Sequence, residues 1–212
     1  KGAVPRWLEI DDPGGTDLTA LDALIGRRTK IVAMTHMSNV LGVRTPAADI
    51  VGIAHAKGVP VLLDGCQAAV HGRVDMQALD VDFYACTGHK LYGPTGIGVL
   101  YGKTERLSSL PPFEGGGEMI DVVERERVTY NAPPHRFEAG TPPILEAIGL
   151  GAAIEWVNAQ DRAAMEAHEA MLRNRAMDGL RSLNWVKLHG QAPDKGAIVA
   201  FEPKGDSWIR SK

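Results

Sequence analysis

Cysteine is scarce in this chain, and its scarcity excludes two classes of protein. Cys66 and Cys86 are too few for a disulfide framework, and their spacing with the histidines fits no zinc site. Two isolated cysteines favour a reducing compartment, so we expect a cytoplasmic protein. No apolar run approaches the ~20 residues of a membrane span. The net charge of −3 gives no basis for a nucleic-acid or anionic-membrane surface.

What is present is typical of a globular α/β protein. Hydrophobic residues make up 44% of the 212 residues and charged residues 23%, enough for one large or two modest domains. Apolar runs predict strands at residues 5–10, 30–35, 59–64, 81–86 and 96–101. The run at 31–34 has no polar alternation, so we expect that strand to be buried on both faces.

Two helices are predicted between these strands. Asp17 can cap a helix with an apolar face over residues 18–25. Thr45 and Pro46 supply an N-cap and a first-turn proline for a helix that ends at Gly58. The helix after Pro46 alternates with strands, which indicates a βαβ unit and a parallel sheet. Its inward residues should be Ala47, Ile50, Val51 and Ala54.

Polar residues follow three successive predicted strands. Asn39 comes after the strand at 30–35, Asp64 and Gln67 after the strand at 59–64, and residues 87–90 after the strand at 81–86. Ligands of open parallel sheets bind at the carboxyl ends of the strands. We therefore expect a site there. The following strand at 96–101 should be antiparallel, because the link is too short for a helical crossover.

Lys90 is the main chemical candidate in this group. A lysine beside Thr87, His89 and several glycines suits a Schiff base with a carbonyl cofactor, and hydroxyl, imidazole and backbone N–H groups suit its phosphate. The alternative is a surface lysine in a Gly/Pro turn, and spacing alone does not separate the two.

The second half of the chain predicts mainly helices. Residues 144–157 form one, and a boundary near 158–161 precedes a second, with strands at 185–188 and 197–201. We expect residues 1–157 to belong to a large domain and 158–212 to begin a small α+β domain. The apolar face of the second helix should carry Met165, Leu172, Ala176, Leu180 and Leu183.

Five motifs, in order, resemble the pyridoxal-phosphate (PLP)-dependent cysteine desulfurases of fold type I, the Suf-type branch of the class V aminotransferases. They occupy residues 35–42, 63–68, 87–98, 114–117 and 136–142. The Gly-His-Lys-Leu-Tyr-Gly-Pro segment joined to Phe-Glu-Ala-Gly-Thr-Pro is the most specific combination. The resemblance implies a mainly parallel sheet flanked by helices.

The resemblance also implies roles for individual residues. Lys90 would form the Schiff base and move protons, and Asp64 would pair with the pyridinium nitrogen. Gln67 would bind the phenolic oxygen, with Asn39 near it and the substrate carboxylate. Thr87 and His89 would hold the phosphate, and Thr141 would reach the phosphate of a neighbouring subunit in a homodimer. Taken singly, Asn39 and Thr141 are also ordinary turn residues, and Asp64 and His89 have structural alternatives.

The same resemblance makes this chain the central portion of its family's sequence. The family's persulfide cysteine, its late substrate-binding arginines and its N-terminal cofactor ligands have no counterpart here, and Cys66 and Cys86 are better explained as core residues. The first hypothesis is a cysteine desulfurase that supplies sulfur from L-cysteine to an acceptor protein of iron–sulfur assembly. The others are a selenocysteine lyase or another class V aminotransferase-like enzyme, and an inactive fragment or dimerisation scaffold.

Overall fold

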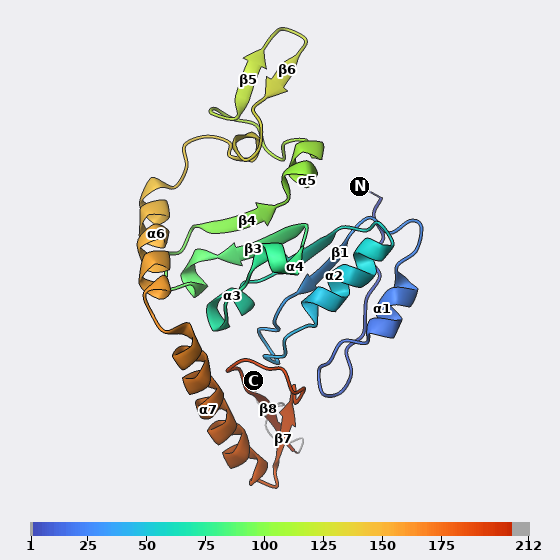
Figure 1. Cartoon of the computed structure of the whole chain (residues 1–212), viewed down its shortest axis with the longest axis vertical. Coiled ribbons are helices and arrows are strands. Elements are labelled where there is room, and N and C mark those ends of the chain that lie inside the picture. Colours follow the sequence, from blue (N-terminus) through green and yellow to red (C-terminus); the bar gives the residue numbers. More distant parts are fainter. Residues whose placement is uncertain (1, 205–212) are drawn as a thin grey trace, which may run out of the picture.

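The computed structural model describes residues 2–204, which form a central sheet with helices and two hairpins around it (Figure 1). In chain order the elements are α1 (Leu18–Leu24), β1 (Val32–Thr35), α2 (Ala47–Ala56), β2 (Val61–Asp64), α3 (Ala68–His71), α4 (Met76–Leu79), β3 (Phe83–Thr87), a 3₁₀ turn (Gly88–Lys90), β4 (Gly98–Gly102), α5 (Thr104–Ser109), β5 (Ile120–Val123), β6 (Val128–Tyr130), a second 3₁₀ turn (His135–Phe137), α6 (Ile144–Asn158), α7 (Arg162–Arg181), β7 (Val186–His189) and β8 (Ala200–Pro203).

The central sheet has the strand order β1-β2-β3-β4. The pairs β1–β2 and β2–β3 are parallel, and β4 runs antiparallel to β3. This confirms the predicted parallel unit and the predicted reversal at the last strand. Because the first three strands are parallel, their carboxyl ends meet at one edge of the sheet.

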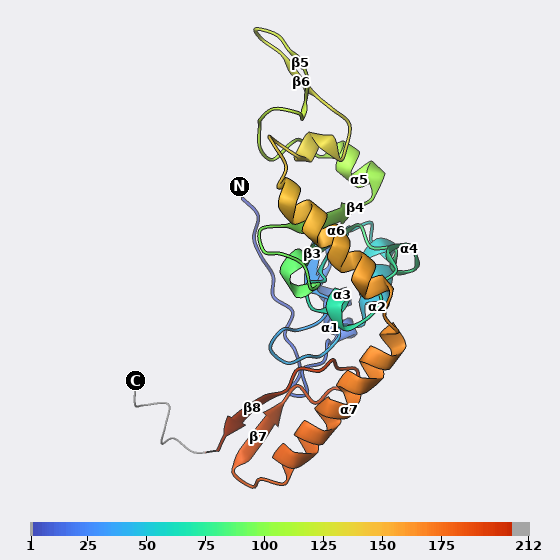
Figure 2. The same cartoon turned by 90° about the vertical axis from the view of Figure 1, so that its left-hand side faces the viewer.

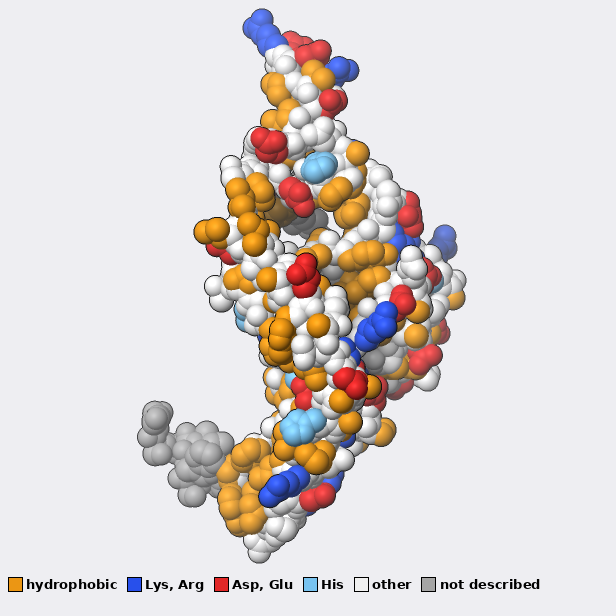
Figure 3. All heavy atoms as spheres, turned by 60° about the vertical axis from the view of Figure 1, so that its left-hand side comes forward, with side chains coloured by type: hydrophobic (Ala, Val, Ile, Leu, Met, Phe, Trp, Pro, Cys, Tyr) orange, Lys and Arg blue, Asp and Glu red, His pale blue; other side chains and the backbone are white. Residues whose placement is uncertain are grey.

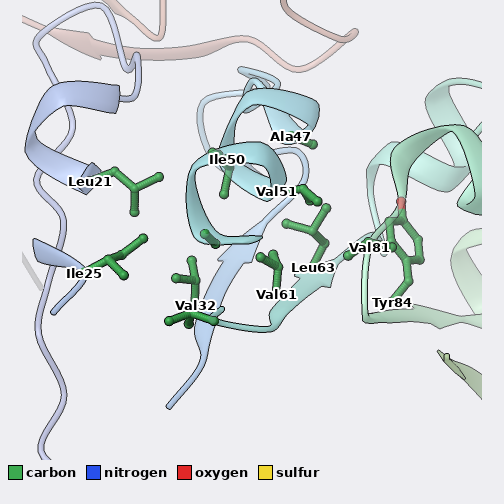
Figure 4. Packing of buried hydrophobic residues seen from close by; sticks show 12 residues of the cluster. Leu21, Ile25, Val32, Ala47, Ile50, Val51, Val61, Leu63, Val81 and Tyr84 are labelled. Atoms are coloured by element: carbon green, nitrogen blue, oxygen red, sulfur yellow. The ribbon is translucent and has the colours of Figure 1, made fainter. Parts of the chain in front are cut away.

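Helix α2 packs over the strands and supplies much of the core. Its four predicted inward residues, Ala47, Ile50, Val51 and Ala54, are all buried. They meet Val32, Val61 and Leu63 of the sheet, as Figure 4 shows. Burying a side chain such as Ile50 contributes about 1.5–3 kcal/mol. The helix begins one residue later than predicted, with Pro46 as its N-cap, and Thr45 Oγ1 instead donates to the carbonyl of Thr35.

Two predictions for the first 35 residues are wrong. Residues 5–10 form no strand, and Ile10 makes only an isolated bridge to Thr16. The strand β1 is not buried on both faces: Val32 is buried, but Ala33 is exposed and Met34 half-buried. The alternation arises because Val32 points towards α2, whereas its neighbours point to the opposite side of the pleat.

The second half of the chain extends along the sheet and beyond it. Helix α6 lies beside β3 and β4, and α7 continues away from it towards β7 and β8; the β5–β6 hairpin projects at the opposite end (Figures 1 and 2). The predicted helices are confirmed. The predicted apolar face of α7 is partly wrong, because Leu172 and Ala176 are exposed and Met177 is the buried residue. Helix α7 packs against the short β7–β8 hairpin, so only a narrow stripe of its side chains becomes buried.

The segment before β8 joins the α7 region to the turn after β1. Gly196 N donates to Gly42 O at 2.8 Å, Arg44 N donates to Asp194 O at 3.0 Å, and Val43 forms an isolated bridge with Lys195. Lys195 is only 6% exposed, and its ammonium group donates to the carbonyl of Leu41. Between residues 2 and 204 no helix combines the length and the apolar composition needed to cross a membrane.

Candidate functional site

The carboxyl ends of β1, β2 and β3 form the candidate site. In the sheet register Thr35 lies beside Asp64, and Asp64 lies beside Ala85. The turns that carry Asn39, Gln67 and Lys90 all leave from this edge. The register confirms the predicted convergence of the three strand ends.

Asp64 ends β2 with its carboxylate exposed. Its Oδ1 accepts a hydrogen bond from the backbone N–H of Cys66 at 2.9 Å, which fixes the side chain in an Asx turn. Among the described residues this is the one backbone donor to that carboxylate, and the Cys66 thiol also hydrogen-bonds it. The group therefore keeps acceptor capacity for a ligand.

Asp64 and Lys90 both affect the pKa of the Cys66 thiol. Burial, a hydrogen bond with Asp64 and the charge of that carboxylate raise the pKa of the Cys66 thiol to about 11, while the charge of Lys90 acts in the opposite direction. Both charges act on the same sulfur atom, which agrees with the position of Asp64 and of the Lys90 turn at the same edge of the sheet. A thiol with this pKa stays protonated at neutral pH and is a poor nucleophile.

A tight turn carries Lys90. Gly88 N donates to Ile97 O at 2.9 Å, and Gly93 N donates to Gly88 O at 3.0 Å. A Cβ atom on Gly88 would lie 2.9 Å from the Ile97 side chain, so only glycine fits here without movement. Lys90 is half-buried and forms no salt bridge with any acidic residue in the described part of the chain. Its amine is thus available to react.

Thr87 and His89 make a polar pair next to this lysine. Thr87 Oγ1 and His89 Nδ1 lie 2.9 Å apart, and the His89 side chain is exposed. A hydroxyl group and an imidazole held together at the end of a strand can both donate to a phosphate oxygen.

The remaining three predicted site residues, Gln67, Asn39 and Thr141, lie on other turns than Lys90. Gln67 is half-buried at the start of α3. Asn39 is exposed on the turn after β1, whose shape is held by hydrogen bonds from the N–H groups of Val40 and Leu41 to Ser38 Oγ. Thr141 is exposed before α6, beside Gly140 with its φ of +82°. Within residues 2–204 no hydrogen bond links Asn39 or Thr141 to Lys90 or Asp64.

His36 and Tyr84 lie under this edge and were assigned no role from the sequence. His36 Nδ1 is 2.9 Å from the Tyr84 hydroxyl, and the two rings meet edge to face at 86°. Burial lowers the pKa of His36 and raises that of Tyr84. Tyr84, an aromatic residue within a predicted strand, was the one signal of this pair in the sequence. Its partner His36 lies 48 positions earlier in the chain, so local pattern could not identify it.

A polar cleft lies elsewhere. Its volume is about 340 Å³, and it lies where α7 meets the segment before β8. Two contacts cross it: His71 Nδ1 is 2.9 Å from Glu169 Oε2, and Arg44 Nε is 3.6 Å from Asp194 Oδ1. These contacts join α3 to α7 and the turn after β1 to the segment before β8.

The donor set at the strand ends fits a phosphorylated pyridine aldehyde such as PLP. An unpaired half-buried amine can form a Schiff base, an exposed carboxylate can bind a ring N–H, and the Thr87–His89 pair can bind phosphate. The described residues hold no group of three or more His, Cys, Asp or Glu side chains that could bind a metal ion.

Comparison with known proteins places this geometry in a family. Residues 1–209 match the family described as Aminotransferase class-V. The chain is 50% identical over 202 residues to a cysteine desulfurase of Dickeya dadantii (strain 3937), covering 95% of the chain and 49% of that protein. It is 45% identical over 202 residues to a probable cysteine desulfurase of Streptomyces coelicolor, covering 94% and 48%.

Solved structures give the same result. The cysteine desulfurase CsdA (S-sulfonic acid) from Escherichia coli matches with a TM-score of 0.88 and 40% identity, over 94% of this chain and 49% of that one. A C-DES variant with glycine covalently linked to its PLP cofactor matches with a TM-score of 0.79 and 26% identity, over 89% and 51%. The predicted fold type I architecture is confirmed, and the chain spans about half the length of the relatives it matches. The chain belongs to the class V aminotransferase family.

Proposed function

We propose that the protein containing this chain is a PLP-dependent cysteine desulfurase. It would convert L-cysteine to L-alanine and pass the sulfur to an enzyme cysteine as a persulfide. The observation that carries the proposal is the position of Asp64 and of the Lys90 turn at neighbouring strand ends of one sheet, in a chain that is 50% identical over 202 residues to a cysteine desulfurase. PLP, when bound, supplies an electron sink for the bonds of the substrate amino acid.

The residues of this chain would bind and orient that cofactor. Lys90 Nζ would join its aldehyde carbon and, once released, carry a proton at the substrate. The free oxygen of Asp64 would accept a hydrogen bond from the ring nitrogen and keep it protonated. Thr87 and His89 would donate to the phosphate.

Three further assignments concern residues that form no hydrogen bond with Lys90 among the described residues. Gln67 would donate to the phenolic oxygen of the cofactor, and Asn39 would lie near this oxygen and the substrate carboxylate. Thr141 would bind the phosphate held by a second subunit. The exposed position of Thr141, on a turn before α6, supports a partner-facing role.

The sulfur-accepting cysteine is proposed to lie in the part of the relatives that this chain does not span. The raised pKa values of Cys66 and Cys86, both caused first by burial, support a different cysteine as nucleophile. Within the chain, we propose that residues 1–157 belong to the cofactor-binding domain and 158–212 begin the small domain.

The proposed partners are a second copy of the chain and a sulfur acceptor of iron–sulfur assembly, in the cytoplasm. Hydrophobic side chains gather on the side of the molecule where α6 and α7 come forward (Figure 3), and α6 exposes Ile144, Leu145, Ile148 and Trp156. A large exposed apolar patch supports association. The two free cysteines support a reducing compartment.

Borohydride reduction of the full-length protein with PLP, followed by peptide mapping, tests the cofactor assignment. The label should sit on Lys90, and Lys90→Ala should abolish alanine release from cysteine. The matched control is Lys30→Ala, because Lys30 is an exposed lysine before β1. Label on another lysine, or alanine release by Lys90→Ala at the wild-type rate, would contradict the proposal.

Two further assays separate the alternatives. Sulfide and alanine from cysteine, compared with selenide and alanine from selenocysteine, distinguish a desulfurase from a selenocysteine lyase. The 212-residue chain alone should release no alanine even where it binds PLP weakly, because it lacks the proposed nucleophile. A full-length protein that binds no PLP would favour a scaffold.

A further inference from the structure

The turn that follows Asp64 rests directly on the ring of Tyr84. A Cβ atom on Gly65 would lie 1.9 Å from two ring carbons of Tyr84 and 2.1 Å from its hydroxyl oxygen. No side chain can occupy that space, so glycine at position 65 allows the backbone to touch the ring. Tyr84 is 1% exposed and belongs to the main hydrophobic cluster, as Figure 4 shows.

His36 holds the Tyr84 ring from the side of β1. Its Nδ1 lies 2.9 Å from the Tyr84 hydroxyl, and the ring centroids are 5.8 Å apart. Burial and Arg44 lower the pKa of His36, whereas burial raises that of Tyr84. The imidazole is therefore neutral and the phenol protonated at neutral pH, and the two groups share one hydrogen bond between His36 Nδ1 and the Tyr84 hydroxyl.

Backbone hydrogen bonds to the neighbouring strands fix the chain on both sides of Asp64. His36 N donates to Asp64 O at 2.8 Å, and Gly65 N donates to Ala85 O at 2.8 Å. Cys66 N then donates to Asp64 Oδ1. The direction of the free carboxylate oxygen thus depends on where the Gly65 backbone lies, and the Tyr84 ring sets that position from below.

We propose that Tyr84, held by His36, is a positioning residue that aims the Asp64 carboxylate through the backbone of Gly65. The inference rests on the proposed function, because Asp64 is assigned there to the cofactor ring nitrogen. A side chain that only fills the core would affect stability alone. Replacing a positioning side chain must also change how the Asp64 carboxylate binds its ligand.

The test compares Tyr84→Leu and Tyr84→Phe with Phe83→Leu in the full-length protein. Phe83 is the preceding residue of β3, buried at 9% exposure, and points to the other face of the pleat. Phe83→Leu therefore removes a ring of equal size from the same strand without touching Gly65. The readouts are the visible absorption maximum of bound PLP, the dissociation constant for PLP, and amide hydrogen exchange of residues 64–67 in cofactor-free protein.

Tyr84→Leu should shift the absorption maximum, weaken PLP binding roughly tenfold, and accelerate exchange at residues 64–67. Tyr84→Phe, which keeps the ring and loses the bond to His36, should give smaller changes in the same direction. Phe83→Leu should lower the thermal stability of the cofactor-free protein but leave all three readouts at wild-type values. Equal readouts in Tyr84→Leu and Phe83→Leu would overturn the proposal.

The outcomes separate this inference from the proposed function. A wild-type protein with no PLP absorption band would overturn the function, while hydrogen exchange would still decide whether Tyr84 fixes the turn. If Tyr84→Leu fails to fold, Tyr84→Phe decides alone: wild-type exchange, absorption and PLP affinity in this variant would overturn the role of the His36–Tyr84 pair.

Discussion

Asp64 and Asp82 lie at opposite ends of the strands of the same central sheet, and they differ in burial and in the number of hydrogen bonds that their carboxylates accept. Asp82 precedes β3, is fully buried and is surrounded by donors: Val61 N and His55 Nε2 at 2.7 Å from Oδ2, and Arg106 Nε at 2.7 Å from Oδ1. Asp64 follows β2, is exposed and meets one backbone donor among the described residues.

The difference separates an acid that holds the fold from an acid that can bind a ligand. A buried carboxylate must have its oxygens satisfied, since an unpaired buried charge costs several kcal/mol. Asp82 meets that requirement by joining α2, β2 and α5. Asp64 keeps spare acceptor capacity, because its carboxylate is exposed and solvent or a ligand can satisfy it. Four predictions test this comparison, in order of expected effect.

Asp64→Asn should have the largest effect, and only on activity. Asparagine still accepts from Cys66 N but carries no charge for the cofactor ring nitrogen, so alanine release by the full-length enzyme should fall on the order of 10³-fold. Its free energy of unfolding without cofactor should change by no more than about 0.5 kcal/mol, because the side chain is exposed. Retained activity would refute the assignment.

Asp82→Asn should show the reverse pattern. It leaves Arg106 and His55 without their buried counter-charge and should lower the free energy of unfolding by about 3 kcal/mol in urea denaturation. Asp80→Asn is the matched control, because Asp80 binds the same His55 at 3.4 Å but is exposed; its loss should be much smaller. Equal losses in both variants would show that burial is not what distinguishes them.

The pH dependence of stability should identify the same acid. Burial opposes ionisation of Asp82, but hydrogen bonds from His55, Val61 N and Arg106 outweigh it and lower its pKa below the ordinary 3.8. A carboxyl whose pKa is lower in the folded state stabilises the fold above its unfolded pKa, and this contribution is lost as pH falls through the folded pKa. The stability difference between wild type and Asp82→Asn should shrink below about pH 4; a constant difference from pH 7 to pH 3 would contradict it.

Cys66→Ala should have the smallest effect, although Cys66 is next to Asp64 in space. With a pKa of about 11, roughly one thiol in 10⁴ is ionised at pH 7. We expect alanine release to change less than about twofold and alkylation of Cys66 by iodoacetamide in the folded protein to be slow. Loss of persulfide formation in Cys66→Ala would instead make it a sulfur carrier. Cys86→Ala is the parallel control.

The buried face of α2 and the parallel strands were predicted correctly, whereas the strand at residues 5–10 and part of the apolar face of α7 were not. The buried face of α2 follows from the spacing of its apolar residues, and the parallel pairing of β1 with β2 follows from the helix between them. Residues 5–10 have a strand-like composition but no partner strand in the described chain, and α7 buries Met177 because of where β7 lies. The β5–β6 hairpin was not anticipated, because its sequence lacks a strong alternating pattern.

By itself, the sequence determined the three parallel strands, the helix over them and the polar residues at the strand ends, since these depend on spacing within a few residues. Only the tertiary structure decided which acid is satisfied and which is free, and that Tyr84 supports Gly65. Those relations join residues about 20 to 50 positions apart, and the chain must fold before their side chains can meet.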